Sequence, residues 1–219
     1  MSIKENRTLI ITGGRIEDEF IKKILESNHY SMIIAVDRGL EVADRFGLPI
    51  DYIVGDFDST SSFLLDKYRE KQIPMKSFPV EKDKSDTHLA VELALNIGTD
   101  AIDLIGATGT RLDHTLANLH LLLIPLQNKT DAFILDSHNK IYLKQDSFTI
   151  DKNRQYGDYI SFLPFHGDVH DLRLEGFKYP LPGILLTAGD SLCISNEIMD
   201  EQAIVSFTDG ILAVFETRD

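Results

Sequence analysis

Two patterns of hydrophobic residues succeed one another along the chain. Up to about residue 135, short apolar runs such as 8–11 alternate with stretches whose apolar residues recur every three or four positions, such as 16–26. The runs are typical of buried strands and the stretches of amphipathic helices. Their alternation predicts a parallel sheet with helices on both faces. The expected strands are 8–11, 32–36, 52–54, 75–78, 101–105 and 132–135, and the expected helices are 16–26, 39–46, 59–70, 86–96 and 111–124, the last ended by Pro125.

Beyond about residue 140 the apolar runs become short, and Gly, Pro, Asp and Asn separate them. Short strands at this spacing are typical of an antiparallel sandwich or barrel. We therefore predict an α/β protein with a parallel-sheet domain of residues 1–140, followed by an antiparallel β-sandwich domain of residues 141–219. The strands expected in the second domain are 141–143, 159–163, 169–174, 184–186, 191–194, 203–207 and 211–215.

The composition of the chain narrows the classes of ligand and the cellular location to be expected. The chain has 22 basic and 35 acidic residues and a net charge of −13, so no basic surface is expected to bind nucleic acid. Its acidity suits a cationic ligand, or an anionic ligand that arrives with a metal, although it also serves plain solubility. No apolar stretch reaches the roughly 18 residues of a membrane span, and the charged N-terminus lacks the apolar run of a secretion signal. The single Cys193, among apolar neighbours, is expected to be buried, and the chain is predicted to be cytoplasmic.

Polar residues follow several of the expected strands. Gly13-Gly14 comes after the first strand, Asp37-Arg38-Gly39 after the second, residues 55–59 after the third and residues 106–111 after a later one. Ligands of parallel sheets bind outside the carboxyl ends of the strands. These segments, distant in sequence, are therefore predicted to meet at one functional site, although each alone is compatible with a turn or a helix cap.

The segment Gly55-Asp56-Phe57-Asp58-Ser59 carries two carboxylates two positions apart. In an extended backbone, Asp56 and Asp58 would point the same way. Two like charges side by side repel each other unless a positive group lies between them. This pair therefore predicts a positive partner at the site.

The glycine-containing segment 106–111 leads into an expected helix. Backbone N–H groups at such a position, together with the helix dipole, favour phosphate, and the guanidinium of Arg111 is a fork of donors suited to phosphate oxygens. Asp113 could orient Arg111, bind metal, or only pair with the helix dipole. The segment is neither a Walker motif nor Gly-x-Gly-x-x-Gly, so a dinucleotide fold is not indicated.

Segment 81–87 carries two basic and three acidic residues. It fits a solvated loop in which Ser85 or Asp86 caps the next helix, and it also fits the charged loops that serve phosphoryl transfer. The histidines are weaker candidates. His114 follows Arg111 and could line the site, whereas His166 and His170 lack the neighbouring ligands of a zinc site.

Seven motifs in this order resemble the thiamine pyrophosphokinase family over nearly the whole chain. They are Asp37-Arg38-Gly39, GDFDS at 55–59, DKSDT at 83–87, GATGTRLDH at 106–114, EGFKYPL at 175–181, SNE at 195–197 and DGILAVFET at 209–217. Thr110 stands where many relatives have glycine, but Arg111 and Asp113 keep their places.

The resemblance implies an ATP-binding catalytic α/β domain, a thiamine-binding β-sandwich domain and a homodimer with the active site between subunits. It also implies transfer of the pyrophosphoryl group of ATP to the hydroxyl of thiamine, which releases AMP. The implied catalytic residues are Asp56, Asp58, Asp86, Arg111 and Asp113. The implied ATP-binding residues are Asp37, Arg38, Lys84, Thr87, Gly106, Gly109, Thr110 and Arg111, and the implied thiamine-binding residues are Tyr179, Ser195 and Asn196.

If the resemblance holds, the positive partner of Asp56 and Asp58 is expected to be Mg²⁺, a hard cation that takes carboxylate and phosphate oxygens. Two alternatives stay open from the sequence. One is a pyrophosphokinase that acts on another alcohol, such as a pterin. The other is a sensor of nucleotide or thiamine that keeps the fold without catalysis, against which the full set of carboxylates argues.

Overall fold

The computed structural model describes residues 6–56, 61–77 and 84–219. The chain divides into two compact units, Met1–Ser137 and His138–Asp219. No helix in the described part of the chain is both long and apolar enough to cross a membrane.

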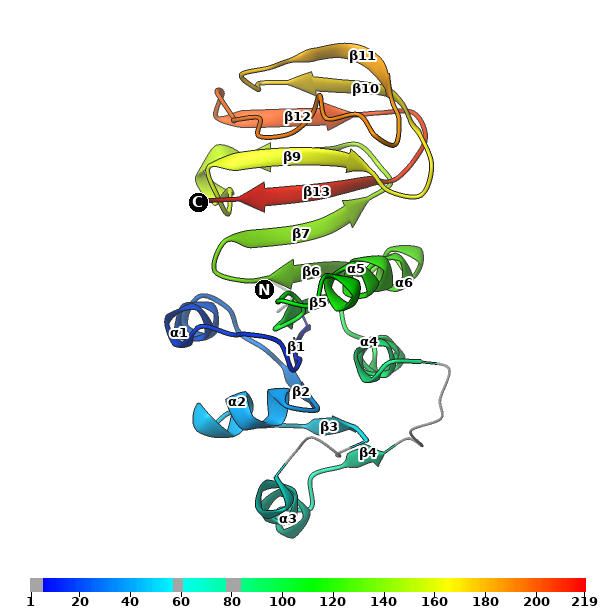
Figure 1. Cartoon of the computed structure of the whole chain (residues 1–219). Helices are drawn as coiled ribbons and strands as arrows, with labels where there is room; N and C mark the ends of the chain where they lie inside the picture. Colours follow the sequence, from blue (N-terminus) through cyan, green and yellow to red (C-terminus); the bar gives the residue numbers. More distant parts are fainter. Residues whose placement is uncertain (1–5, 57–60, 78–83) are drawn as a thin grey trace. The chain divides into compact units, whose positions relative to one another are not determined.

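The first unit contains a parallel sheet with strand order β4-β3-β2-β1-β5-β6 (Figure 1). The order reverses at β1, since the chain adds strands on one side of β1 and then crosses to β5 on the other. Buried runs that are mostly apolar produce the central strands; in β5, for example, all five residues are buried, Asp103 among them. The strands are β1 (Arg7–Ile11), β2 (Met32–Val36), β3 (Tyr52–Gly55), β4 (Met75–Ser77), β5 (Ala101–Ile105) and β6 (Asp131–Leu135).

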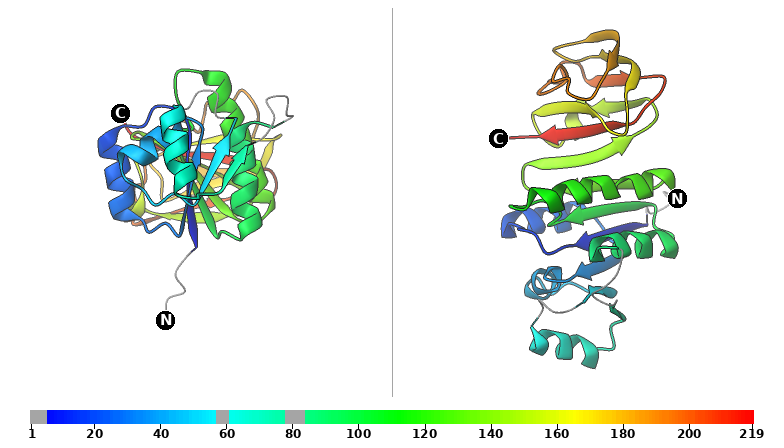
Figure 2. Two further views of the ribbon diagram at one scale, coloured as in Figure 1. Left: turned by 90° about the horizontal axis from the view of Figure 1, so that it is seen from below. Right: turned by 45° about the vertical axis from the view of Figure 1, so that its right-hand side comes forward.

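Helices cover both faces of this sheet, with α1 and α2 on one side and α4, α5 and α6 on the other (Figures 1 and 2). Sequence signals fix the ends of α4: the Ser85 side chain accepts a hydrogen bond from His88 N–H, and Gly98 closes the helix at φ 91°, which glycine adopts readily. The helices are α1 (Asp18–Ser27), α2 (Gly39–Arg45), α3 (Ser62–Glu70), α4 (Asp86–Ile97), α5 (Leu112–Leu121) and α6 (Leu123–Gln127). The predicted parallel α/β architecture is confirmed.

The prediction that Pro125 ends a long helix is wrong. The helix divides at Leu122 into α5 and α6, and Pro125 lies buried inside α6. In the first turn of a helix, a proline displaces no hydrogen bond, because the N–H groups there have no partner within the helix. Proline at this position is therefore compatible with a new helix.

The second unit is built of antiparallel strands, as predicted for a sandwich. Strands β7-β13-β9 pair in this order, and β11-β10-β12-β8 form a separate sheet. An aromatic contact links the two groups of strands, since Tyr142 of β7 and Phe148 of β8 have ring centroids 6.4 Å apart. The strands are β7 (Asn139–Lys144), β8 (Phe148–Asp151), β9 (Tyr159–Pro164), β10 (Val169–Glu175), β11 (Leu181–Leu186), β12 (Gln202–Ser206) and β13 (Leu212–Thr217), and a 3₁₀ turn covers Lys152–Arg154.

Two details of the second unit differ from the prediction. Strand β8 was not predicted, and residues 191–194, predicted as a strand, form a turn. Ile194 N–H bonds back to Ser191 C=O, and Cys193 C=O accepts from Phe162 N–H of β9. Within the turn, Cys193 is buried at 2% exposed, whereas the apolar neighbours Leu192 and Ile194 are 64% and 45% exposed, so the apolar run does not mark a buried strand.

Candidate active site

A cavity of about 570 Å³ lies at the carboxyl ends of the parallel strands in the first unit. It includes the segments that follow β1 and β5, the neighbouring strands between which the strand order reverses, and this is the usual ligand position in open α/β sheets. The cavity is lined by residues 12–15, 36–38, 85, 87 and 106–111, and by His114, Thr115, Ala117 and Asn118 of α5.

Glycines let the segments after β1 and β5 pack backbone to backbone. Gly14 N–H donates to Gly106 C=O at 2.9 Å. A Cβ on Gly14 would lie 2.1 Å from that oxygen and 2.6 Å from the carbonyl oxygen of Thr108, so any larger residue would push the two segments apart. Gly106 itself has φ 71°, a conformation with little cost only for glycine. The cavity floor therefore depends on glycine at both positions.

Asp37 connects the ends of β2 and β3. Its backbone is left-handed, with φ 48°, and its N–H donates to Val54 C=O at 3.0 Å. A Cβ on Gly55 would lie 2.2 Å from Asp37 Oδ1, so the glycine makes room for this carboxylate. The arrangement brings the Asp37 side chain to the backbone residue that precedes Asp56.

Arg111 and Asp113 form a paired unit at the start of α5. Arg111 donates from Nη2 to Asp113 Oδ2 at 2.6 Å, and from Nε to Oδ1 at 3.3 Å. This hydrogen bond lowers the pKa of the Asp113 carboxyl and raises the pKa of the Arg111 guanidinium. Both side chains are about two-thirds exposed, at 67% and 64%. Of the roles considered for Asp113, this geometry supports orientation of the guanidinium.

The predicted residues of segment 83–87 separate into two groups. Thr87 lines the cavity, as does the cap residue Ser85. Lys84 instead extends along α4, where its Nζ lies 2.7 and 2.9 Å from the two carboxylate oxygens of Glu92. This contact is the main cause of the lowered pKa of Glu92. Asp86 is the first residue of α4 and does not line the cavity.

One face of α5 adds two polar residues that the sequence patterns did not single out, Thr115 and Asn118. Arg111, His114, Thr115 and Asn118 follow the spacing i, i+3, i+4, i+7, which places them on one side of a helix, and all four line the cavity. Asn118 Nδ2 donates to Ala107 C=O at 2.7 Å and so holds the loop before the helix. A polar stripe at helical spacing was the signal available in the sequence.

The carboxylates predicted to bind metal are only partly covered by the structure. Asp56 directly follows β3, whereas Asp58 lies outside the described residues. Within the described part, no group of three or more His, Cys, Asp or Glu side chains is placed to hold a metal. Hard carboxylate oxygens, such as those of Asp37 and Asp56, nevertheless fit the donor chemistry of Mg²⁺.

In the second unit, Asn196 organises the backbone around Tyr179. Asn196 is 3% exposed; its Oδ1 accepts from Tyr179 N–H at 3.0 Å and its Nδ2 donates to Tyr179 C=O at 2.8 Å. Ser195 is held in the left-handed region at φ 55°, and its N–H donates to Ser161 Oγ at 2.9 Å. Tyr179 remains 59% exposed. The three predicted residues are therefore neighbours, with Tyr179 presented to solvent.

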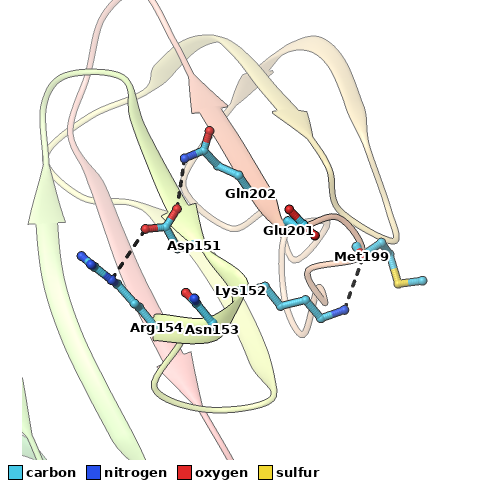
Figure 3. Close-up of a pocket in the computed structure, with 7 residues that line it drawn as sticks. All are labelled: Asp151, Lys152, Asn153, Arg154, Met199, Glu201 and Gln202. Atoms are coloured by element: carbon cyan, nitrogen blue, oxygen red, sulfur yellow. Dashed lines mark hydrogen bonds and ion pairs between the residues drawn. The ribbon is translucent and has the colours of Figure 1, made fainter.

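The second unit also has an open hollow of about 900 Å³, lined by Asp151, Lys152, Asn153, Arg154, Met199, Glu201 and Gln202 (Figure 3). Several of its polar groups bond within the unit: Gln202 Nε2 donates to Asp151 Oδ1 at 3.0 Å, and Lys152 Nζ donates to Met199 C=O at 3.3 Å. None of the residues predicted for a site lies here, and we assign it no role.

Comparison with known proteins agrees with the geometry. Residues 23–134 match the family model "Thiamin pyrophosphokinase, catalytic domain", and residues 147–212 match "Thiamin pyrophosphokinase, vitamin B1 binding domain". Thiamine pyrophosphokinase of Bacillus subtilis is 34% identical over 195 residues, which cover 88% of this chain and 90% of that protein.

Solved structures give the same result. The thiamine pyrophosphokinase structure from Bacillus subtilis aligns with a TM-score of 0.87 at 31% identity and covers 98% of this chain and all of that one. The thiamin pyrophosphokinase structure from Geobacillus thermodenitrificans aligns with a TM-score of 0.84 at 30% identity, over 97% of this chain and 98% of that one. The chain therefore belongs to the thiamin pyrophosphokinase family.

Proposed function

We propose that this chain transfers the pyrophosphoryl group of ATP to the hydroxyl group of thiamine, giving thiamine diphosphate and AMP. The observation that carries the proposal is the cavity of about 570 Å³ at the strand-order reversal. It lies in the unit that matches a catalytic-domain model, and the same chain continues into a unit that matches a vitamin B1 binding model.

The reaction requires positioning and neutralisation of charge more than covalent chemistry by the protein. The hydroxyl oxygen of thiamine attacks the β-phosphorus of ATP, the bond from that phosphorus to the oxygen bridging to the α-phosphate breaks, and AMP leaves as the hydroxyl loses its proton. In the proposed arrangement the N–H groups of loop 106–110, Arg38 and Arg111 bind phosphate oxygens. The pairing of Arg111 with Asp113 supports this role, because it fixes the plane of the guanidinium.

Mg²⁺ is the proposed metal, with Asp56 and Asp58 as its protein ligands. These carboxylates would hold the ion, which would supply positive charge to offset that of the transferring phosphate groups. Without a metal, polyanionic ATP would have to bind to a chain whose net charge is −13. The proposed remaining roles are nucleotide binding by Asp37, Lys84, Thr87, Gly106, Gly109 and Thr110, and catalysis by Asp86.

The proposed thiamine side is the Tyr179 region of the second unit, with Ser195 and Asn196, and the proposed enzyme is a cytoplasmic homodimer whose sites lie between subunits. A cation already lies near the Tyr179 ring, since Lys178 Nζ is 5.7 Å from its centroid. Lys178 Nζ is itself paired with Glu197 Oε1, and the proposed partner of the exposed ring is the cationic thiazolium of thiamine. The two hydrogen bonds from Asn196 to the Tyr179 backbone suggest that Asn196 acts by positioning this residue.

Product analysis tests the proposal directly. Purified protein with MgATP and thiamine should give AMP and thiamine diphosphate in equal amounts. AMP with a different diphosphate ester, formed only when another alcohol replaces thiamine, would favour a related pyrophosphokinase. Binding of nucleotide or thiamine without turnover would favour a sensor.

Replacing Arg111 with Lys is expected to raise the KM for ATP about tenfold with little change in the KM for thiamine. Lysine keeps the charge but loses the forked donor pair and the two-point contact with Asp113. Steady-state kinetics with each substrate varied in turn would measure both constants. Equal KM values for ATP in the variant and the wild type would leave Arg111 a purely structural role.

Replacing Tyr179 with Ala is expected to raise the KM for thiamine about 2- to 30-fold and leave ATP binding intact, because an aromatic face beside a cation contributes about 0.5–2 kcal/mol. Tyr179→Phe keeps the ring and is the matched control, expected to stay near the wild-type value. A loss of the same size in Phe and Ala would assign the effect to the hydroxyl group instead.

The same variant also tests the subunit arrangement. Heterodimers of an Asp56→Asn subunit with a Tyr179→Ala subunit should recover one competent site if each site draws on both chains. A heterodimer with the wild-type KM for thiamine would support the shared site, and one that keeps the raised KM of Tyr179→Ala would place both substrates within one subunit.

A further inference from the structure

We propose that Asp136 is a positioning residue for ATP, because its carboxylate holds the phosphate-binding loop 106–110 in its binding shape. This inference rests on the proposed ATP-binding role of the cavity. Asp136 directly follows β6, the strand next to β5 in the sheet, and it is not among the described residues that line the cavity.

A hydrogen bond between side chains connects Asp136 to the loop. Thr108 Oγ1 donates to Asp136 Oδ2 at 2.8 Å, in a partly buried setting. Parallel pairing of β5 with β6, in which Ile105 lies opposite Leu135, brings the residues after the two strands to the same edge. The contact is thus a direct result of strand register and joins residues 28 positions apart.

Two further contacts hold the same loop from other elements. Asn118 of α5 donates to Ala107 C=O at 2.7 Å, and the Gly14 turn after β1 donates to Gly106 C=O at 2.9 Å. The loop is therefore held on three sides, by β1, by α5 and by β6. The contact with Asp136 is made by side chains alone, so a substitution can remove it without changing the backbone.

The Thr108 hydroxyl donates to Asp136. The contact is therefore expected to act on ATP indirectly, by holding the backbone of the loop in place. A loop already fixed in its bound shape pays little ordering entropy when phosphate binds. A loop released from Asp136 would have to be ordered by ATP itself. We therefore expect the effect of this contact in the affinity for ATP, with little effect on thiamine or on the rate constant of the bound complex.

The test compares Thr108→Val, Thr108→Ser and Asp136→Ala. Valine matches the shape of threonine but cannot donate, whereas serine keeps the hydroxyl. Thr108→Val and Asp136→Ala should each raise the KM for ATP about 3- to 10-fold, the size expected for one lost hydrogen bond. Thr108→Ser, which keeps the donor, should restore most of the ATP affinity that Thr108→Val loses, and the Thr108→Val/Asp136→Ala double variant should be no worse than either single variant.

Controls separate positioning from general destabilisation and from failure of the proposed reaction. Asp131→Ala, at the exposed opposite end of β6, is the matched control and should leave both KM values unchanged. Calorimetric titration with MgATP, without thiamine, measures the affinity for ATP. It therefore tests the loop contact even if the wild-type protein made no thiamine diphosphate. Unchanged ATP affinity in Thr108→Val would overturn the proposal, as would parallel rises in the KM values for ATP and thiamine.

Discussion

Replacement of Asp56 by Asn is expected to lower turnover about a hundredfold or more while the protein keeps its fold. Asparagine has the shape of aspartate and keeps one oxygen, so the substitution removes charge and little else. A metal ion held by carboxylates stabilises negative charge that develops on phosphate oxygens by several kcal/mol, and a loss of about 3 kcal/mol corresponds to roughly a hundredfold in rate. Asp58→Asn is expected to behave in the same way on the grounds of the sequence pattern alone.

The position of Asp56 makes it the best placed carboxylate for this test. It directly follows β3 at the carboxyl edge of the sheet. The Asp37 carboxylate lies beside that strand end, in space that only glycine leaves free, since a Cβ on Gly55 would lie 2.2 Å from Asp37 Oδ1. Two carboxylates at one strand edge attract a cation and repel ATP unless the cation is present. The loss in Asp56→Asn should therefore depend on the concentration of Mg²⁺.

Turnover measured across a range of Mg²⁺ concentrations would check this expectation, with Asp66→Asn as control. Asp66 is exposed on α3 and paired with Arg69 at 2.8 Å, so its loss should change neither rate nor metal dependence. Wild-type turnover in excess EDTA, or an Asp56→Asn enzyme with a normal rate and a normal Mg²⁺ requirement, would argue against the metal assignment.

The sequence predicted the first unit well because its strands are buried on both faces. Run 32–36 coincides with β2, where a continuous apolar run is largely buried, and run 101–105 coincides with β5, which is buried throughout although it contains Asp103. The same reasoning produced the error at 191–194. There one buried side chain, Cys193, anchors a turn, and a short apolar run cannot distinguish this case from a strand.

The contacts that shape the candidate site were harder to predict. Glycine and aspartate at strand ends drew attention to residues 37 and 106, because parallel topology gathers the strand ends at one edge. The pairing of Thr108 with Asp136 and of Lys84 with Glu92 depends on strand register and side-chain direction, which no single-sequence pattern records. The roles of the predicted site residues remain predictions that the substitutions above would test.

A second large effect is expected far from the cavity, in the buried charge of β5. Asp103→Ala should lower the free energy of unfolding by about 3–5 kcal/mol, the usual cost of breaking a buried ion pair. Asp103 is 1% exposed; its Oδ1 accepts from Arg7 Nη1 at 2.7 Å, and its Oδ2 accepts from the Tyr30 hydroxyl at 2.7 Å.

The cost arises from the groups that the substitution leaves behind. Arg7, whose side chain is only 20% exposed, would keep its charge near the core without this carboxylate, and the Tyr30 hydroxyl would lose its acceptor. Tyr30→Phe should cost only about 1 kcal/mol, because the Arg7–Asp103 pair survives and one hydrogen bond is lost. The difference in unfolding free energy between the two variants separates the contribution of the buried ion pair from that of the tyrosine hydrogen bond.

Chemical unfolding at pH 7, with activity measured per folded molecule, would check both variants. Burial, with Asp103 as the second cause, raises the pKa of Tyr30, so its neutral form is favoured in the folded state. Because folding raises the pKa of Tyr30, its contribution to the free energy of unfolding is fully present below the unfolded pKa of about 10 and falls as the pH rises further. Measurement at pH 7 therefore reports the full contribution. None of the three residues lines the cavity, so the folded fraction of Asp103→Ala should keep wild-type turnover. If Asp103→Ala lowered the free energy of unfolding by less than about 1 kcal/mol, water or another group would have to replace the carboxylate. If the folded variant lost turnover, this buried cluster would also shape the edge of the sheet that carries the cavity.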